Sequence, residues 1–141
     1  MIKYKKLPYN IEKLLPDAAG YLRSRHDVVF AYLFGSLARG TLHSLSDVDI
    51  AVYLEYGENS AETKLDIIGG LMDALHTDEI DLVVLNYASE ALKMKILECK
   101  TILVDKAPFV RHRYESETLR RYFDFVPYEK RILERRFSHG R

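Results

Sequence analysis

Two apolar runs on either side of a glycine, within residues 28–54, constrain the fold of this chain more than any other stretch. The first run, Val28–Phe34, is rich in β-branched and aromatic residues and ends at Gly35, which is typical of a buried strand followed by a turn. The second run, residues 46–54, follows a short polar connection and includes Asp47 and Asp49. The sequence therefore predicts two strands with a glycine turn between them.

The glycine turn has the residue types of a phosphate-binding site. Gly35 can take backbone angles that other residues avoid, and Ser36 after it can cap a short helix whose amide groups face an anion. Arg39, in the same turn, carries a permanent positive charge that can neutralise a triphosphate. A surface salt bridge explains Arg39 equally well, so both interpretations stay open.

Two aspartates begin the second strand. Asp47 and Asp49 lie two residues apart in an extended run, so both carboxylates leave the same face of the strand. Two like charges so close repel each other unless a cation lies between them, and magnesium is the usual solution. An isolated pair of this spacing is often only two exposed carboxylates on a sheet edge. The preceding strand and the Gly-Ser turn favour the metal-binding interpretation here.

The length and composition of the chain limit the classes of protein to which it can belong. Its 141 residues predict a single domain, residues 1–141, with little room for a second substrate-binding domain. Lys plus Arg and Asp plus Glu number 21 each, so the chain lacks the basic excess that is typical of nucleic-acid binders. Because it has no apolar run of membrane length, no signal-peptide pattern and one cysteine, Cys99, we expect a cytoplasmic protein without a membrane segment.

The rest of the chain alternates between helical and extended patterns. A helix over residues 11–25 is expected to begin or kink near Pro16. Further helices are expected over residues 61–76 and 88–98, and further strands over residues 80–85 and 101–104. This order predicts an α/β or α+β fold, in which a small mixed β-sheet is covered by helices on one side and the core spans about residues 10–105.

The expected helix over residues 61–76 has an apolar stripe that predicts its buried face. The members of the stripe recur at three- and four-residue steps: Leu65, Ile68, Leu71, Met72 and Leu75. A glycine pair, Gly69 and Gly70, lies within the stripe and predicts a close approach of this helix to the sheet.

The C-terminal segment, residues 108–137, is predicted to be helical and to be broken by Pro127 near residues 124–126. Arginines and aromatic residues alternate in it with acidic residues. This mixture favours a surface on which another protein or a second subunit docks, over packing on its own domain or binding of nucleic acid.

A third aspartate, Asp81, begins the apolar run over residues 80–85. A carboxylate at the start of a buried strand is costly unless it is exposed, hydrogen-bonded or bound to a cation. From its own surroundings, Asp81 is explained as well by a turn at the strand end as by a metal site, and Asp78 and Glu79 lie close by.

These motifs together resemble the signature of a known superfamily. Gly35-Ser36, ten intervening residues and Asp47-x-Asp49 ahead of an apolar strand are similar to the pattern of the polymerase-beta-like nucleotidyltransferases. The wording Gly-Ser-Leu-Ala-Arg-Gly and Ser-Asp-Val-Asp-Ile-Ala-Val most resembles its minimal nucleotidyltransferase (MNT) branch, including the MntA antitoxins of HEPN/MNT toxin–antitoxin pairs. The resemblance implies the nucleotidyltransferase fold, which the predicted C-terminal helical docking segment would follow.

The resemblance also implies roles for the site residues. Three carboxylates would hold two magnesium ions and catalyse the transfer: Asp47, Asp49 and, as the third carboxylate of the family, Asp81. The phosphates of a nucleoside triphosphate would be bound by Gly35 and Ser36, with Arg39 beside them.

The activity that the resemblance implies is magnesium-dependent protein adenylylation. The chain would be an antitoxin that uses ATP to AMPylate a hydroxyl side chain, a tyrosine, of a HEPN ribonuclease toxin. The sequence contains no P-loop Gly-x-x-x-x-Gly-Lys, which argues against an ATPase. Two alternatives stay open: a non-catalytic antitoxin that masks the toxin by binding it, and a nucleotidyltransferase that modifies small molecules, as aminoglycoside-modifying relatives do.

Overall fold

The computed structural model describes residues 11–35, 38, 47–58 and 61–139, with side chains described up to residue 124. Its sheet has four strands in the order β3-β2-β1-β4. Strand β1 (Val28–Phe34) is antiparallel to β2 (Val48–Leu54) and to β4 (Thr101–Asp105), whereas β2 is parallel to β3 (Ile80–Val84). The prediction of a small mixed sheet is confirmed.

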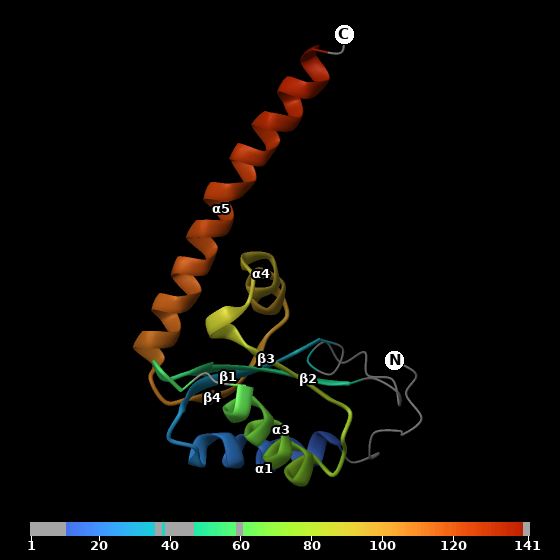
Figure 1. Cartoon of the computed structure of the whole chain (residues 1–141), viewed down its shortest axis with the longest axis vertical. Helices are drawn as coiled ribbons and strands as arrows, with labels where there is room; N and C mark the ends of the chain where they lie inside the picture. Colours follow the sequence, from blue (N-terminus) through green and yellow to red (C-terminus); the bar gives the residue numbers. More distant parts are fainter. Residues whose placement is uncertain (1–10, 36–37, 39–46, 59–60, 140–141) are drawn as a thin grey trace.

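Helices cover both faces of the sheet (Figure 1). Helices α1 (Ile11–Ser24) and α3 (Ala61–Leu75) pack on one face, while α4 (Glu90–Glu98) and the first turns of α5 (Pro108–His139) lie on the other. The expectation of helices on one side only was wrong. Strand β1 is central and is buried along nearly its whole length, and such a strand needs cover on both faces.

Helix α1 begins at Ile11 and contains Pro16 in its interior, so the helix does not begin at the proline. A proline inside a helix removes one backbone hydrogen bond. Apolar residues on both sides of it, Ile11 before and Ala18 and Leu22 after, are fully or almost fully buried in the core. We attribute the continuation of the helix through Pro16 to this burial.

Helix α3 is the crossover between the parallel strands β2 and β3. Its buried face differs from the predicted stripe: Ile67 is fully buried, whereas Leu65 is 69% exposed. Gly70 faces α1 rather than the sheet, because a methyl group placed on it would overlap the ring of Tyr21. The glycine therefore permits a close approach between two helices.

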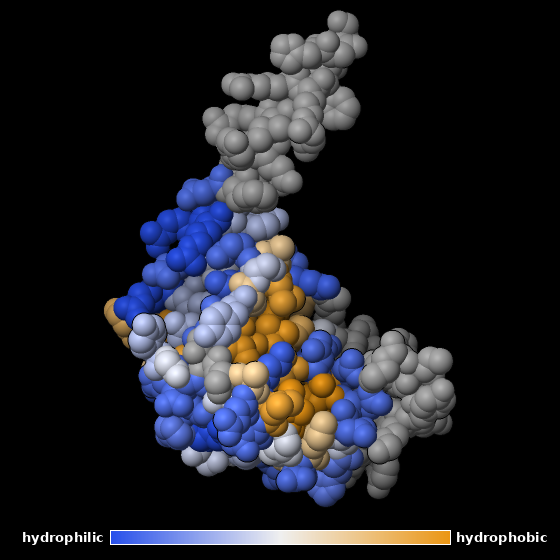
Figure 2. Space-filling model, in the orientation of Figure 1, coloured by the Kyte–Doolittle hydropathy of each residue, from blue (hydrophilic) through white to orange (hydrophobic). Residues whose placement is uncertain are grey.

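Strand β3 forms one edge of the sheet, and α4 and α3 lie on either side of it (Figure 1). The chain leaves β3 through a short 3₁₀ turn, η1 (Leu85–Tyr87), before α4 begins. Figure 2 shows an apolar patch on the molecular surface at this edge. Apolar side chains thus remain accessible where the sheet ends.

Helix α5 is one continuous helix that projects away from the body of the molecule (Figure 1). The predicted break near residues 124–126 was wrong, since the helix includes Pro127. A proline inside a helix costs about 3 kcal/mol relative to alanine, and the helix nevertheless continues through this one. Among the described residues, none of the helices combines the length and apolarity needed to span a membrane.

Candidate active site

The parallel pairing of β2 and β3 brings two of the predicted site residues together. Asp49 and Asp81 are direct register partners in these strands. Paired residues in neighbouring strands, about 4.8 Å apart, send their side chains to the same face of the sheet. Asp49 is half-buried and Asp81 is exposed, so the two carboxylates lie side by side where the sheet meets solvent.

Asp47 lies immediately before β2 and is half-buried. The backbone N–H of Val48 donates to the carbonyl of Glu79 at 2.9 Å, which ties the start of β2 to the start of β3. The bond holds the start of β2 close to Glu79, the residue before β3. The chain segment carrying Asp47 is therefore fixed at the same end of the sheet as Asp81.

Gly35 completes this end of the sheet from the other side of β2. Phe34, the last residue of β1, is the antiparallel partner of Asp49. Gly35 has a φ of +74°, and a methyl group added to it would overlap the Asp49 carboxylate and lie 2.9 Å from its Cγ. Both the backbone angle and the contact with Asp49 require glycine at this position.

The other two predicted nucleotide-binding residues, Ser36 and Arg39, lie outside the described residues. Ala38 between them is described, and it packs against the core on the side of α1 and α3. The structure therefore gathers Gly35, Asp47, Asp49 and Asp81 at one end of the sheet.

The carboxylates share a face of the sheet with an aromatic cluster. Side chains alternate along β2, so Asp49 and Tyr53 leave the same face, which is the face that α4 and α5 cover. Tyr53 stacks on Phe30 with ring centroids 4.8 Å apart, and Tyr114 of α5 contacts both rings. The cluster fills the middle of this face and leaves the carboxylates at its end.

A buried polar network, which the sequence analysis did not predict, joins the base of α5 to the sheet. The hydroxyl of Tyr32 on β1 donates to Glu115 Oε2 at 2.5 Å, and Arg111 donates to Glu115 Oε1 at 3.0 Å. Arg111 Nε also lies 3.0 Å from Asp105 Oδ2 of β4. These contacts fix α5 to two strands of the sheet.

The network perturbs the acidity of its members. Burial, followed by the hydrogen bond to Glu115, raises the pKa of Tyr32. Burial alone would raise the pKa of Glu115, but the hydrogen bond from Tyr32 and the charges of Lys100 and Arg111 lower it below its ordinary value. Glu115 therefore keeps its charge, and the network acts as a structural attachment of α5.

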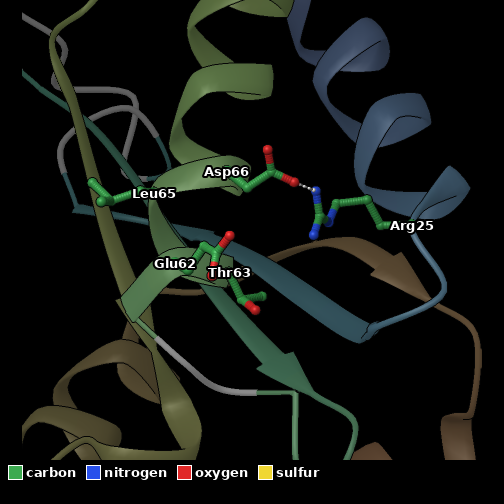
Figure 3. A pocket seen from close by; sticks show the side chains of 5 residues that line it. All are labelled: Arg25, Glu62, Thr63, Leu65 and Asp66. Atoms are coloured by element: carbon green, nitrogen blue, oxygen red, sulfur yellow. Dashed lines mark hydrogen bonds and ion pairs between the residues drawn. The ribbon is translucent and has the colours of Figure 1, made fainter.

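A second polar cluster lies at the other end of β1, around Arg25 (Figure 3). Arg25 donates to Asp27 through Nε at 2.9 Å and through Nη2 at 2.7 Å, and to Asp66 at 2.7 Å. The hydrogen bond from Arg25, which outweighs the effect of burial, lowers the pKa of Asp27. The adjoining pocket of about 520 Å³ is lined by Glu62, Thr63, Leu65, Asp66 and Arg25 itself, whose charge is already balanced.

His26, Asp27 and Glu58 also bring three possible metal ligands within 4.8 Å of one another. Both carboxylate oxygens of Asp27 already accept hydrogen bonds from Arg25, which leaves them poorly placed for a cation. His26 and Asp27 precede β1 and Glu58 follows the antiparallel β2, so the group lies at the opposite end of β1 from Gly35, roughly 20 Å away. The cluster is thus distinct from the predicted carboxylate site.

Comparisons with known proteins identify the family and the fold. The family model described as polymerase beta, nucleotidyltransferase, matches residues 17–109. A chain of a toxin–antitoxin crystal structure with AMP-PNP is 26% identical, with a TM-score of 0.66 over 91% of this chain and 96% of that chain. None of the curated protein sequences compared with the chain matches it significantly.

Two further solved structures are similar. A chain of a MntA-HpeT toxin–antitoxin mutant, with two aspartates two positions apart replaced by glutamate, is 25% identical, with a TM-score of 0.65 over 91% of this chain and 96% of that chain. A chain of a complex between a tri-AMPylated Shewanella oneidensis HEPN toxin and an MNT antitoxin has a TM-score of 0.67 at 20% identity, over 90% of this chain and 98% of that chain. The second likeness concerns the fold alone.

Proposed function

Because the chain belongs to the polymerase beta nucleotidyltransferase family, we propose that it is an antitoxin of the protein adenylyltransferase type, which transfers AMP from ATP to a hydroxyl side chain of a HEPN-domain toxin. The observation that carries this proposal is the register of Asp49 beside Asp81, with Asp47 at the same end of the sheet. Three carboxylates at one exposed sheet end suit phosphoryl chemistry, which depends on charge neutralisation and positioning.

The proposed reaction is a substitution at the α-phosphorus of ATP. The acceptor oxygen attacks the α-phosphorus of ATP and forms a new O–P bond, while the bond from that phosphorus to the oxygen bridging to the β-phosphorus breaks. Pyrophosphate leaves with the bridging oxygen. We propose that Asp81 takes the proton of the acceptor hydroxyl, and its exposure and its position beside Asp49 support this role. The acceptor that we propose is a tyrosine.

The residues present fit a magnesium site. Carboxylate oxygens are the donors that magnesium prefers, and the neighbouring charges of Asp49 and Asp81 repel each other without a cation. Asp47, Asp49 and Asp81 would hold the metal. Two magnesium ions, when bound, would neutralise the phosphates and lower the pKa of the acceptor hydroxyl.

The nucleotide phosphates would lie at the Gly35 turn. The Asp49 carboxylate takes the space that a side chain would fill at Gly35, so the glycine lets the turn lie in contact with this carboxylate. We propose that Ser36 binds the phosphates through its hydroxyl and backbone amide, and that Arg39 neutralises part of their charge.

Helix α5 supports a macromolecular acceptor rather than a small one. It projects from the body, and two apolar side chains one helical turn apart, Leu119 and Phe123, are 37% and 61% exposed. We propose that this surface docks the HEPN toxin, as an assembly in the cytoplasm. Toxin–antitoxin complexes among the similar structures, including one with AMP-PNP, support this assignment.

The test is the intact mass of a HEPN-domain protein, measured after incubation with the chain, magnesium and each nucleoside triphosphate in turn. Mass increments of one or more AMP units are expected with wild type and are expected to be lost with the Asp47→Asn, Asp49→Asn double variant. The control is Asp73→Asn, which changes an exposed carboxylate on α3. A toxin that is silenced without a mass change would establish masking, and an unbound, unmodified toxin would point to a small-molecule acceptor.

A further inference from the structure

A groove runs along the outer edge of β3 and begins at the carboxylate site. Its volume is about 430 Å³, and its floor consists of four consecutive residues of the strand, from Asp81 to Val84. Consecutive residues of a strand point alternately to opposite faces, so a groove lined by all four follows the strand edge itself. The groove coincides with the apolar patch at this edge in Figure 2.

The edge of β3 offers backbone hydrogen bonds to a further strand. In the parallel ladder, the carbonyl of Glu79 accepts from Val48 of β2, which sets the alternation along the strand. The backbone groups of Asp81 and Val83 therefore point to β2, while those of Leu82 and Val84 point to the open edge. An extended chain can pair with this edge, as peptides do in strand addition.

The two ends of the groove carry opposite charges. One wall is formed by Tyr87, which is 68% exposed, together with Leu92 of α4, and the opposite wall by Lys64 in the first turns of α3. Helix α3 runs back antiparallel to β3, so Lys64 lies toward the end of the strand and Asp81 at its start. A positive charge thus marks the end of the groove away from the carboxylates.

The position of Tyr87 at the end of the groove is fixed by the preceding residue. Asn86 accepts from the backbone N–H of Leu54 at 2.9 Å and donates to the carbonyl of the same residue at 3.0 Å. This double hydrogen bond joins the turn after β3 to the end of β2. These hydrogen bonds fix the backbone next to Tyr87 and so limit the positions that its ring can take.

We propose that this groove receives an extended segment of the acceptor protein, which adds to the edge of β3 as a fifth strand and brings its hydroxyl to Asp81. The inference rests on the proposed function and deepens it. Continuity with Asp81 favours this occupant, because a chain that lies along β3 toward its start arrives at the carboxylate that takes the hydroxyl proton. Lys64 favours a segment with an acidic residue at its distal end, and the apolar floor favours apolar side chains in between.

The first test is a crosslink, which does not depend on catalysis. The photoreactive residue p-benzoylphenylalanine is placed at position 87 in the full chain, and at position 56 as a control, because Tyr56 is fully exposed and lies outside the groove. Irradiation with the HEPN protein is expected to give a crosslinked peptide that contains the AMPylated residue or its near neighbours, from position 87 and not from position 56. A crosslink to a second copy of the chain, or none from position 87, would overturn the proposal.

The second test is kinetic. The double variant Lys64→Glu, Tyr87→Asp is expected to raise the KM for the HEPN protein by about tenfold or more, and to raise it more than the KM for ATP. The matched control, Lys95→Glu with Tyr56→Asp, changes exposed residues outside the groove and is expected to leave both values within about twofold.

The experiments can disprove the groove assignment and the proposed transferase function independently of each other. If the wild-type chain labels the HEPN protein while the groove variant keeps the wild-type KM and position 87 gives no crosslink, the groove assignment is wrong and the transferase stands. If the wild-type chain transfers no AMP, the proposed function fails, and the crosslink from position 87 still decides whether the groove holds the partner.

Discussion

Asp49 on β2 and Asp81 on β3 are direct partners in a parallel register, although they lie 32 positions apart in the sequence. The crossover helix α3 fills this separation and returns the chain to the same end of the sheet. The β2-α3-β3 unit therefore brings the two carboxylates together. Substitutions that shift β2 against β3 would change the distance between them.

Replacement of Asp81 by Asn is expected to lower the rate of AMP transfer by at least about 100-fold, because the variant loses a proton acceptor and a negative charge beside Asp49. Asp81 is exposed, so the free energy of unfolding is expected to change little. Transfer is measured by intact mass over time and stability by urea unfolding. Asp73→Asn serves as the control, and equal rates for the two variants would remove Asp81 from the catalytic set.

Replacement of Gly35 by Ala is expected to reduce both stability and transfer. The added methyl group meets the Asp49 carboxylate, and a φ of +74° is strained for alanine, so the free energy of unfolding falls by about 1–3 kcal/mol. The control is Gly20→Ala in α1, where the methyl group has open space and stability is expected to rise by about 0.5–1 kcal/mol. An unchanged unfolding curve for Gly35→Ala would contradict the geometry of this turn.

Asp27 is expected to make folding stability depend on acid pH. The hydrogen bond from Arg25 lowers the pKa of Asp27 below its ordinary value of 3.8, so its contribution is complete well above that pH and is lost as the pH falls through 3.8 and the lower folded value. The stability difference between wild type and Asp27→Asn, measured by urea unfolding, is therefore expected to be larger at pH 7 than near pH 3. Asp17→Asn, which changes an exposed carboxylate of α1, is the matched control.

Replacement of Phe123 by Asp is expected to weaken binding of the HEPN protein by about tenfold or more, because Phe123 is 61% exposed on the projecting helix and an apolar contact would be replaced by a charge. Stability of the isolated chain is expected to change by less than about 0.5 kcal/mol. Binding is measured by calorimetry with Tyr56→Asp as the control for an exposed aromatic residue elsewhere. Wild-type affinity in the Phe123 variant would place the docking surface outside this part of α5.

The strands were predictable from the sequence because their signal is local. Continuous apolar runs predicted both strands: β1 has the expected bounds, Val28–Phe34, whereas β2 begins at Val48, one residue after Asp47. The Asp-x-Asp pair and Gly35 were found in the same way, by spacing along one stretch of chain. Their adjacency to Asp81 needed the resemblance to a family, because no local pattern sets which strands are neighbours.

The errors concern contacts between distant segments. Leu65 fits the helical stripe of α3 but is exposed, since burial depends on the rotation of the helix against α1 and the sheet. The hydrogen bond from Tyr32 to Glu115 joins residues 83 positions apart, and nothing near either residue predicts it. The continuity of α5 through Pro127 likewise depends on the balance over the whole helix rather than on the proline alone.

The carboxylate site and the projecting part of α5 come from separate segments of the chain. The carboxylate site is built within residues 34–84, whereas the projecting helix comes from residues 108–139 and is attached through Glu115 and Arg111 at its base. Substitutions on the outer turns of the helix leave the register of Asp49 and Asp81 unchanged. The outer surface of α5 can therefore vary in sequence without any change in the residues that align Asp49 with Asp81.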